Sequence, residues 1–125
     1  MGQAVIHFEV TGKDAEKLHS FYSDLFDWEI DASNPMNYGI VGGQGGHKNA
    51  QGAGIGGGVG PTQEGGEGHV TFYVEVDDVT AALEKAEGLG ATTVLPESDV
   101  MEGVVIGLFN DPDGNMIGLV KAQPA

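Results

Sequence analysis

The sequence predicts an α+β fold of two βαβββ modules, which form a cup-shaped (half-barrel) mixed sheet with the helices outside. Alternating strands run through Val10 and through Val76, and an amphipathic helix follows each of them. Residues 10 and 76 are 66 positions apart in a chain of 125 residues, about half its length. A repeat of this length predicts a duplicated unit, and a cup made of two such units suits a small ligand.

The first module begins with a predicted strand over residues 4–10, in which successive residues alternate between two faces. Asp14 is suited to cap the helix that follows, which should end near Leu25 or Phe26. Its apolar stripe, expected to pack in the core, consists of Leu18, Phe21, Tyr22 and Leu25. Short strands are expected at residues 28–31 and 38–41, with Tyr38 packing in the core or in a cup wall.

The composition changes over residues 42–68, where 13 of the 27 residues are glycine. A short strand around Ile55 and Val59 should close the first module. The rest of this stretch has few side chains able to pack, so we expect mobile loops. We therefore expect a single domain over residues 1–125, with module one at about 1–60, a linker at about 61–68 and module two at about 69–125.

The second module repeats this order. The alternating pattern of residues 70–76 predicts a strand. Asp77 or Asp78 should cap a second helix, and Gly88 and Gly90 should end it. The last three strands are expected at residues 92–95, 104–109 and 116–120. Residues 111–115, with the sequence Asp-Pro-Asp-Gly-Asn, predict a tight hairpin between the final two strands.

In the first strand of each module, successive residues point to opposite faces, and the two faces differ in composition. The faces that carry only apolar residues should pack on the helices, so the mixed faces should line the cup. The candidate ligand-binding residues on these mixed faces are His7, Glu9, His69, Thr71, Tyr73 and Glu75, with Val5 beside them.

The charge balance excludes two classes of partner. The chain has 19 acidic and 5 basic residues, for a net charge of −14. Nucleic acids and anionic membranes both require clustered cations, so we expect neither as a partner. A neutral or cationic small molecule is favoured. The absence of cysteine and of a signal peptide at the N-terminus favours a cytoplasmic location.

The pattern resembles the vicinal oxygen chelate superfamily of glyoxalases, bleomycin-resistance proteins and extradiol dioxygenases. The resemblance covers nearly the whole chain. It rests on Phe21 and Tyr22 with Leu25 and Trp28, on the strand end at residues 76–79, and on the turn at residues 111–115. It implies paired βαβββ modules, a cup-shaped site and a homodimer.

Catalytic members of this superfamily hold a divalent metal with His and Glu side chains. Carried over to this chain, the four ligand positions fall on Val5, Thr71, Gly118 and the region around Gly56. These residues supply no set of ligands, so the chain resembles the members that bind a small molecule without a metal or other cofactor.

One alternative stays open. His7, Glu9, His69 and Glu75 lie close to the expected positions and could hold one divalent metal ion in a displaced site. The first hypothesis is therefore a metal-free protein that binds a small, neutral or cationic, partly apolar ligand. The second is a metal-dependent lyase, isomerase or dioxygenase. A third is an acid–base isomerase without a metal.

Overall fold

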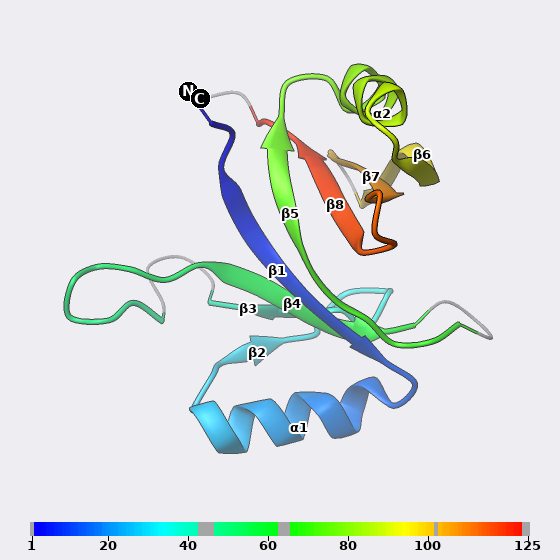
Figure 1. The fold of residues 1–125 in the computed structure, drawn as a ribbon. Coiled ribbons are helices and arrows are strands. Elements are labelled where there is room, and N and C mark those ends of the chain that lie inside the picture. The colour runs from blue at the N-terminus through cyan, green and yellow to red at the C-terminus, as the bar shows by residue number, and fades with distance from the viewer. Residues whose placement is uncertain (1, 43–46, 63–65, 102, 124–125) are drawn as a thin grey trace. The chain divides into compact units, whose positions relative to one another are not determined.

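The computed structural model describes residues 2–42, 47–62, 66–101 and 103–123, which divide between two compact units. We name Ile6–Val70 the N-terminal unit, and Met1–Val5 with Thr71–Ala125 the C-terminal unit. Each is built from one helix and four strands in the order βαβββ (Figure 1). The predicted α+β class and the repeated module are confirmed.

The N-terminal unit contains a mixed four-stranded sheet in the order β2-β3-β4-β1. β1 runs parallel to β4, while the β2–β3 and β3–β4 pairs are antiparallel. α1 lies along one face of this sheet (Figure 1). The elements are β1 (Val5–Gly12), α1 (Ala15–Phe26), β2 (Ile30–Asp31), β3 (Gly39–Val41) and β4 (Gly56–Pro61).

α1 begins where the sequence predicts, because the Asp14 carboxylate accepts a hydrogen bond from the backbone N–H of Lys17. Only part of its predicted apolar stripe packs against the rest of the unit. Tyr22 stacks on Trp28, with ring centroids 5.7 Å apart. Phe21 and Leu25 are 53% and 57% exposed, so the expectation that they lie in the core is wrong.

β4 forms an ordered strand from the glycine-rich stretch because aromatic rings fill the space its missing side chains leave. The ring of Tyr38 lies over Gly58 and Gly60, and the ring of Phe8 lies over Gly57 on the opposite face. A methyl group at any of these positions would overlap the ring. The predicted strand around Ile55 and Val59 is therefore confirmed as β4, whose Val59 is fully buried. The predicted loop also includes residues 43–46 and 63–65, which lie outside the described residues.

The C-terminal unit repeats the architecture with the strand order β5-β8-β7-β6. β5 is parallel to β8, and β7 is antiparallel to both β8 and β6. The elements are β5 (Val70–Val76), α2 (Val79–Gly88), β6 (Thr92–Met101), β7 (Val104–Asn110) and β8 (Met116–Lys121).

The core of this unit lies between α2 and one face of its sheet. Val76, Val79, Leu83 and Leu119 form a buried cluster, and Val74 packs against it. Asp78 caps α2 through the backbone N–H of Ala81, and the predicted turn before β8 is closed by hydrogen bonds to Asp111. β6 is longer than predicted. It continues to Met101 through three shifts of register against β7, which alternation alone does not reveal.

We predict that Gly58→Ala destabilises the protein by about 2–3 kcal/mol, because the added methyl group must displace the Tyr38 ring. Urea unfolding measures this difference. Gly88→Ala is the matched control, since a methyl group there meets nothing within 4 Å. In a helix that change should be neutral or stabilise by up to about 1 kcal/mol. Equal effects of the two substitutions would contradict the role given to the ring.

Candidate functional site

The polar side chains of β1 lie on the face of its sheet that points away from α1. Phe8 contacts Trp28 on the helix side, with ring centroids 5.4 Å apart. Successive residues of a strand point to opposite faces, so His7 and Glu9 lie on the other side. The sequence predicted this assignment, and the regular pairing of β1 with β4 preserves it without a bulge.

Four side chains on this face form a continuous hydrogen-bonded network, which we call the Glu9 network: His7, Glu9, Tyr38 and His69. The Nε2 atom of His7 lies 2.8 Å from the Tyr38 hydroxyl. That hydroxyl donates to Oε1 of Glu9 at 2.9 Å. Nε2 of His69 lies 2.6 Å from Oε2 of Glu9. All four residues belong to the N-terminal unit.

The Glu9 carboxylate is the centre of the network. The residue is 8% exposed, and each of its oxygens accepts a hydrogen bond from a different side chain. Since Tyr38 gives its proton to Glu9, its oxygen accepts from the Nε2–H of His7. These three hydrogen bonds all run toward the carboxylate, which compensates part of the cost of burying it.

Burial lowers the pKa of His7 below its ordinary value, and the charge of Glu9 opposes the shift only in part. Burial acts this way because a low-dielectric environment disfavours the charged imidazolium. Near neutral pH, His7 is therefore a neutral imidazole, which agrees with its role as a donor to Tyr38 through one nitrogen.

Three further predicted residues lie in the C-terminal unit. Thr71 is buried, and its hydroxyl donates to the backbone carbonyl of Met116 at 2.6 Å. Tyr73 is 5% exposed and its ring covers Gly118, directly across the β5–β8 pair. Glu75 is partly buried, and its backbone N–H donates to Ala4. The side chains of Thr71 and Tyr73 thus have packing roles within their own unit.

The positions at which the resemblance places metal ligands do not fit a metal. The Tyr73 ring fills the space that a side chain at Gly118 would need. Gly56 has no side chain, Val5 is apolar, and the hydroxyl of Thr71 is bonded to Met116. In the described ranges 2–42, 47–62, 66–101 and 103–123, no three His, Asp or Glu side chains are grouped as a metal site requires.

Sequence reasoning missed the polar role of Tyr38, which it treated as apolar packing. One signal could have found it. Gly56, Gly58 and Gly60 alternate along β4 and leave one face of the strand flat. A flat face of this kind fits an aromatic ring from a neighbouring segment, and Tyr38 directly precedes β3, the partner of β4. The hydroxyl at the end of that ring then reaches Glu9.

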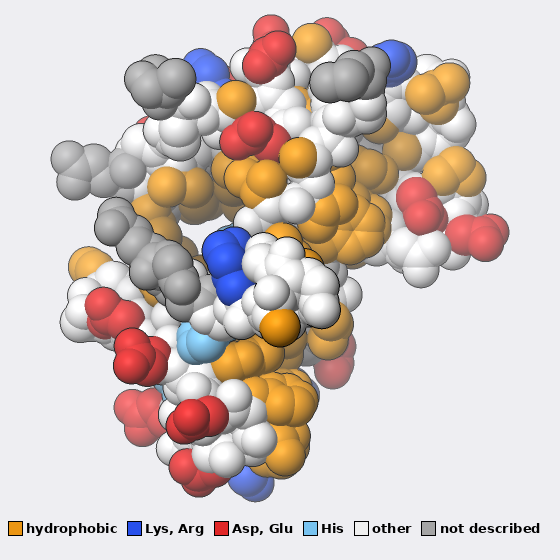
Figure 2. Space-filling view, turned by 90° about the vertical axis from the view of Figure 1, so that its left-hand side faces the viewer, with side chains coloured by type: hydrophobic (Ala, Val, Ile, Leu, Met, Phe, Trp, Pro, Cys, Tyr) orange, Lys and Arg blue, Asp and Glu red, His pale blue; other side chains and the backbone are white. Residues whose placement is uncertain are grey.

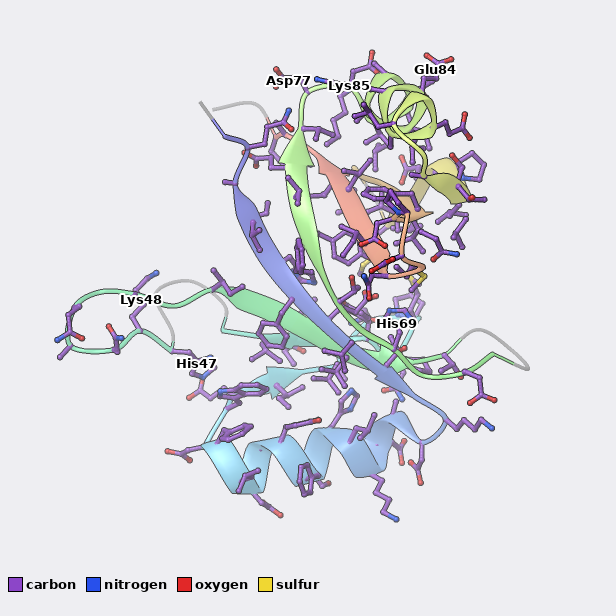
Figure 3. All side chains as sticks on the ribbon, viewed as in Figure 1. His47, Lys48, His69, Asp77, Glu84 and Lys85 are labelled. Atoms are coloured by element: carbon purple, nitrogen blue, oxygen red, sulfur yellow. The ribbon has the colours of Figure 1, made fainter. Side chains whose placement is uncertain are left out.

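The other two histidines lie outside the Glu9 network. Nε2 of His19 lies 2.6 Å from the backbone carbonyl of Val59, on the helix side of β4. His47 accepts a hydrogen bond from the backbone N–H of Glu29 at 3.4 Å, and its ring lies near Trp28. Figure 3 shows His47 and His69 on separate segments of the N-terminal unit.

We predict that His7 makes stability depend on pH. Because its pKa is lowered in the folded state, its stabilising contribution is complete above about pH 6.5 and is lost as the pH falls below that value. Urea unfolding at about pH 8 and about pH 5 should show a larger loss for the natural protein than for His7→Gln. The glutamine amide keeps a donor for Tyr38 without titrating. Parallel pH curves for the two proteins would refute this role.

No helix in the described part of the chain is long and apolar enough to span a membrane.

No curated protein matches the chain. Solved structures do match it. Methylmalonyl-CoA epimerase from Mycobacterium tuberculosis aligns with a TM-score of 0.64 at 14% identity, over 96% of this chain and 88% of that one.

Two other structures show the same fold. The Streptomyces coelicolor methylmalonyl-CoA epimerase in complex with 2-nitronate-propionyl-CoA aligns with a TM-score of 0.66 at 15% identity, over 98% of this chain and 99% of that one. The Mn(II)-bound glyoxalase from Novosphingobium aromaticivorans aligns with a TM-score of 0.64 at 16% identity, over 95% of this chain and 38% of that one. Identities this low establish the fold alone. The profile of one family matches residues 4–119, and the chain therefore belongs to the Glyoxalase/Bleomycin resistance protein/Dioxygenase superfamily.

Proposed function

We propose that this protein is a metal-free member of its superfamily that binds a small, neutral or cationic, partly apolar molecule. The observation that carries the proposal is the Glu9 network. Its carboxylate is buried and bonded to Tyr38 and His69, where a metal-binding carboxylate would present an oxygen to the ion. We place His7, Glu9 and His69, which all belong to the N-terminal unit, in the binding site. Ligand contacts of Thr71, Tyr73 and Glu75 stay predictions.

The filled space over Gly118 supports the metal-free part of the proposal. A carboxylate at that position would require the buried Tyr73 ring to move, at a cost typical of overpacked cores, about 1–3 kcal/mol. The alternative is a metal-dependent lyase, isomerase or dioxygenase that uses His7, His69, Glu9 and Glu75. It requires Glu9 to exchange its bonds to Tyr38 and His69 for a metal ion.

Charge supports the choice of ligand. Figure 2 shows carboxylate side chains scattered over the face in view, with few lysines among them. The chain carries 19 acidic against 5 basic residues, so an anionic ligand would meet a repulsive field on approach. Aromatic and aliphatic side chains would supply the apolar contacts, as is usual in small-molecule sites.

The homodimer and the cytoplasmic location stay predictions. α1 leaves Phe21, Leu25 and Phe26 each more than half exposed. Exposed apolar side chains in a row are the kind of surface that a second copy of the chain would cover, as the resemblance implies.

We predict that protein purified without a histidine tag contains far less than one divalent metal ion per chain, because the residues that the structure describes offer no group of three ligands. Elemental analysis by mass spectrometry measures the content, and EDTA should leave the melting temperature unchanged. Close to one equivalent of zinc, manganese, iron or nickel, lost in His7→Ala, would overturn the proposal and favour the metal-dependent alternative.

We predict that benzyl alcohol and benzylammonium bind near the Glu9 network while benzoate does not. These three probes share a ring and differ in charge. Fragments of this size should bind with a Kd of about 1 mM, detectable as shifts in the NMR signals of His7 and His69. His7→Ala should weaken binding, and the exposed control Glu84→Gln should not. Preferential binding of benzoate would contradict the charge argument.

A further inference from the structure

Among the described side chains, one buried polar atom has no hydrogen-bond partner: the Nδ1 atom of His47. It lies against Gly42, where an added Cβ atom would be 3.0 Å from it. Such atoms are rare in folded proteins, because a buried polar group without a partner costs free energy. Neither the Glu9 network nor the packing of the rings over β4 uses this imidazole.

The backbone of His47 is strained as well. Its φ is 60°, in the left-handed region that residues other than glycine rarely adopt. Strained residues of this kind persist where the surrounding structure holds them. Two contacts do so here. The Nε2 atom of His47 accepts a hydrogen bond from the backbone N–H of Glu29 at 3.4 Å, and the ring lies 6.3 Å from that of Trp28, measured between centroids.

These contacts attach a turn that is otherwise self-contained. In residues 47–54, which we call the Asn49 turn, the carboxamide oxygen of Asn49 accepts from the backbone N–H groups of Gln51 and Ala53. Among the described residues, the bond from Glu29 to His47 is the one hydrogen bond that joins this turn to another segment. Figure 3 shows His47 on the side of the turn that faces α1 and β2. The attachment of the turn therefore depends on His47.

The bond from Glu29 fits one protonation state of the ring. A backbone N–H can only donate, so Nε2 of His47 must present a lone pair, and the proton of the neutral ring lies on Nδ1. A protonated ring would set a second donor against the N–H of Glu29. It would also bury a charged Nδ1–H without an acceptor. In water both nitrogens of an imidazolium can donate, so acid favours the state in which the ring has left this place.

The other charged groups near the ring do not produce this response. The segment beside it carries Asp27, Glu29 and Asp31, and the turn carries Lys48, all of them exposed to screening by water. β3 and β4 carry no charged side chain. Aspartate, glutamate and lysine side chains as classes keep their charge between about pH 5 and pH 8, whereas histidine changes its charge in that range.

We propose that His47 is a pH-sensitive latch, which holds the Asn49 turn against Trp28 near neutral pH and releases it in acid. The Trp28 ring also contacts that of Phe26, with centroids 5.0 Å apart, and Phe26 is 52% exposed. Release uncovers Trp28 beside it and so enlarges the apolar surface at the end of α1. The latch is separate from the Glu9 network and does not depend on the binding function proposed above.

Two readouts of the natural protein test the latch. The protection of the Glu29 amide against hydrogen exchange, corrected for the intrinsic rate at each pH, should fall about fivefold between about pH 8 and about pH 5, the effect of one lost hydrogen bond. Trp28 is the single tryptophan of the chain, so its fluorescence reports on this place alone. Quenching of that fluorescence by acrylamide should increase over the same range.

Two variants separate the latch from other effects of acid. In His47→Gln the amide oxygen keeps an acceptor for Glu29 without titrating, so both readouts should change little with pH. His7 is intact in this variant, so an acid response that arises from His7 would remain. Lys48→Gln is the matched control, because it changes a charge in the same turn and keeps the latch. It should respond to acid as the natural protein does.

Nitrogen NMR of the natural protein supplies a readout that needs no substitution. At about pH 8 the neutral ring of His47 should carry its proton on Nδ1. A proton on Nε2 would overturn the proposal. Equal protection of the Glu29 amide at both pH values would also overturn it, as would an acid response of His47→Gln as large as that of the natural protein.

Discussion

The buried carboxylate of Glu9 is the interaction on which the rest of the site depends. An ionised carboxylate without partners in a protein interior costs several kcal/mol, roughly the size of a whole domain's net stability. Here Tyr38 and His69 compensate that cost by donating to separate oxygens. The three side chains consequently fix one another, and His7 joins through Tyr38. Removing one partner leaves the charge buried, so the network should respond to substitution as a unit.

Glycine in the strands makes this network possible, and it also admits an aromatic ring at one position where the superfamily resemblance expects a metal ligand. Tyr38 reaches Glu9 only because Gly58 and Gly60 leave room for its ring. In the other unit, Tyr73 occupies the space above Gly118 in the same manner. Both units thus exchange a side chain on one strand for an aromatic ring from elsewhere. At Gly118, where the superfamily resemblance expects a carboxylate ligand, the Tyr73 ring fills the space that a side chain would need.

The same arrangement connects the packing of β4 to the Glu9 network. Rings that cover glycines bury large apolar areas against the backbone, and the hydroxyl of the Tyr38 ring also donates to Glu9. A change on β4 that moves this ring therefore affects both packing and the orientation of Glu9. His69 is attached to β1 through the backbone hydrogen bonds that it makes with Thr11.

The sequence by itself determined the two βαβββ modules, the caps at Asp14 and Asp78, and the face of β1 that carries His7 and Glu9. Each follows from local rules: the period of the apolar residues, the preference of Asp for helix starts, and the alternation of strands. Tertiary structure alone decided that Tyr38 bonds to Glu9, that aromatic rings cover the glycines of β4, and that Phe21 and Leu25 remain exposed. These outcomes depend on strand pairing and on which segment fills the space above a glycine. Such contacts join residues far apart in the chain, and no local pattern records them.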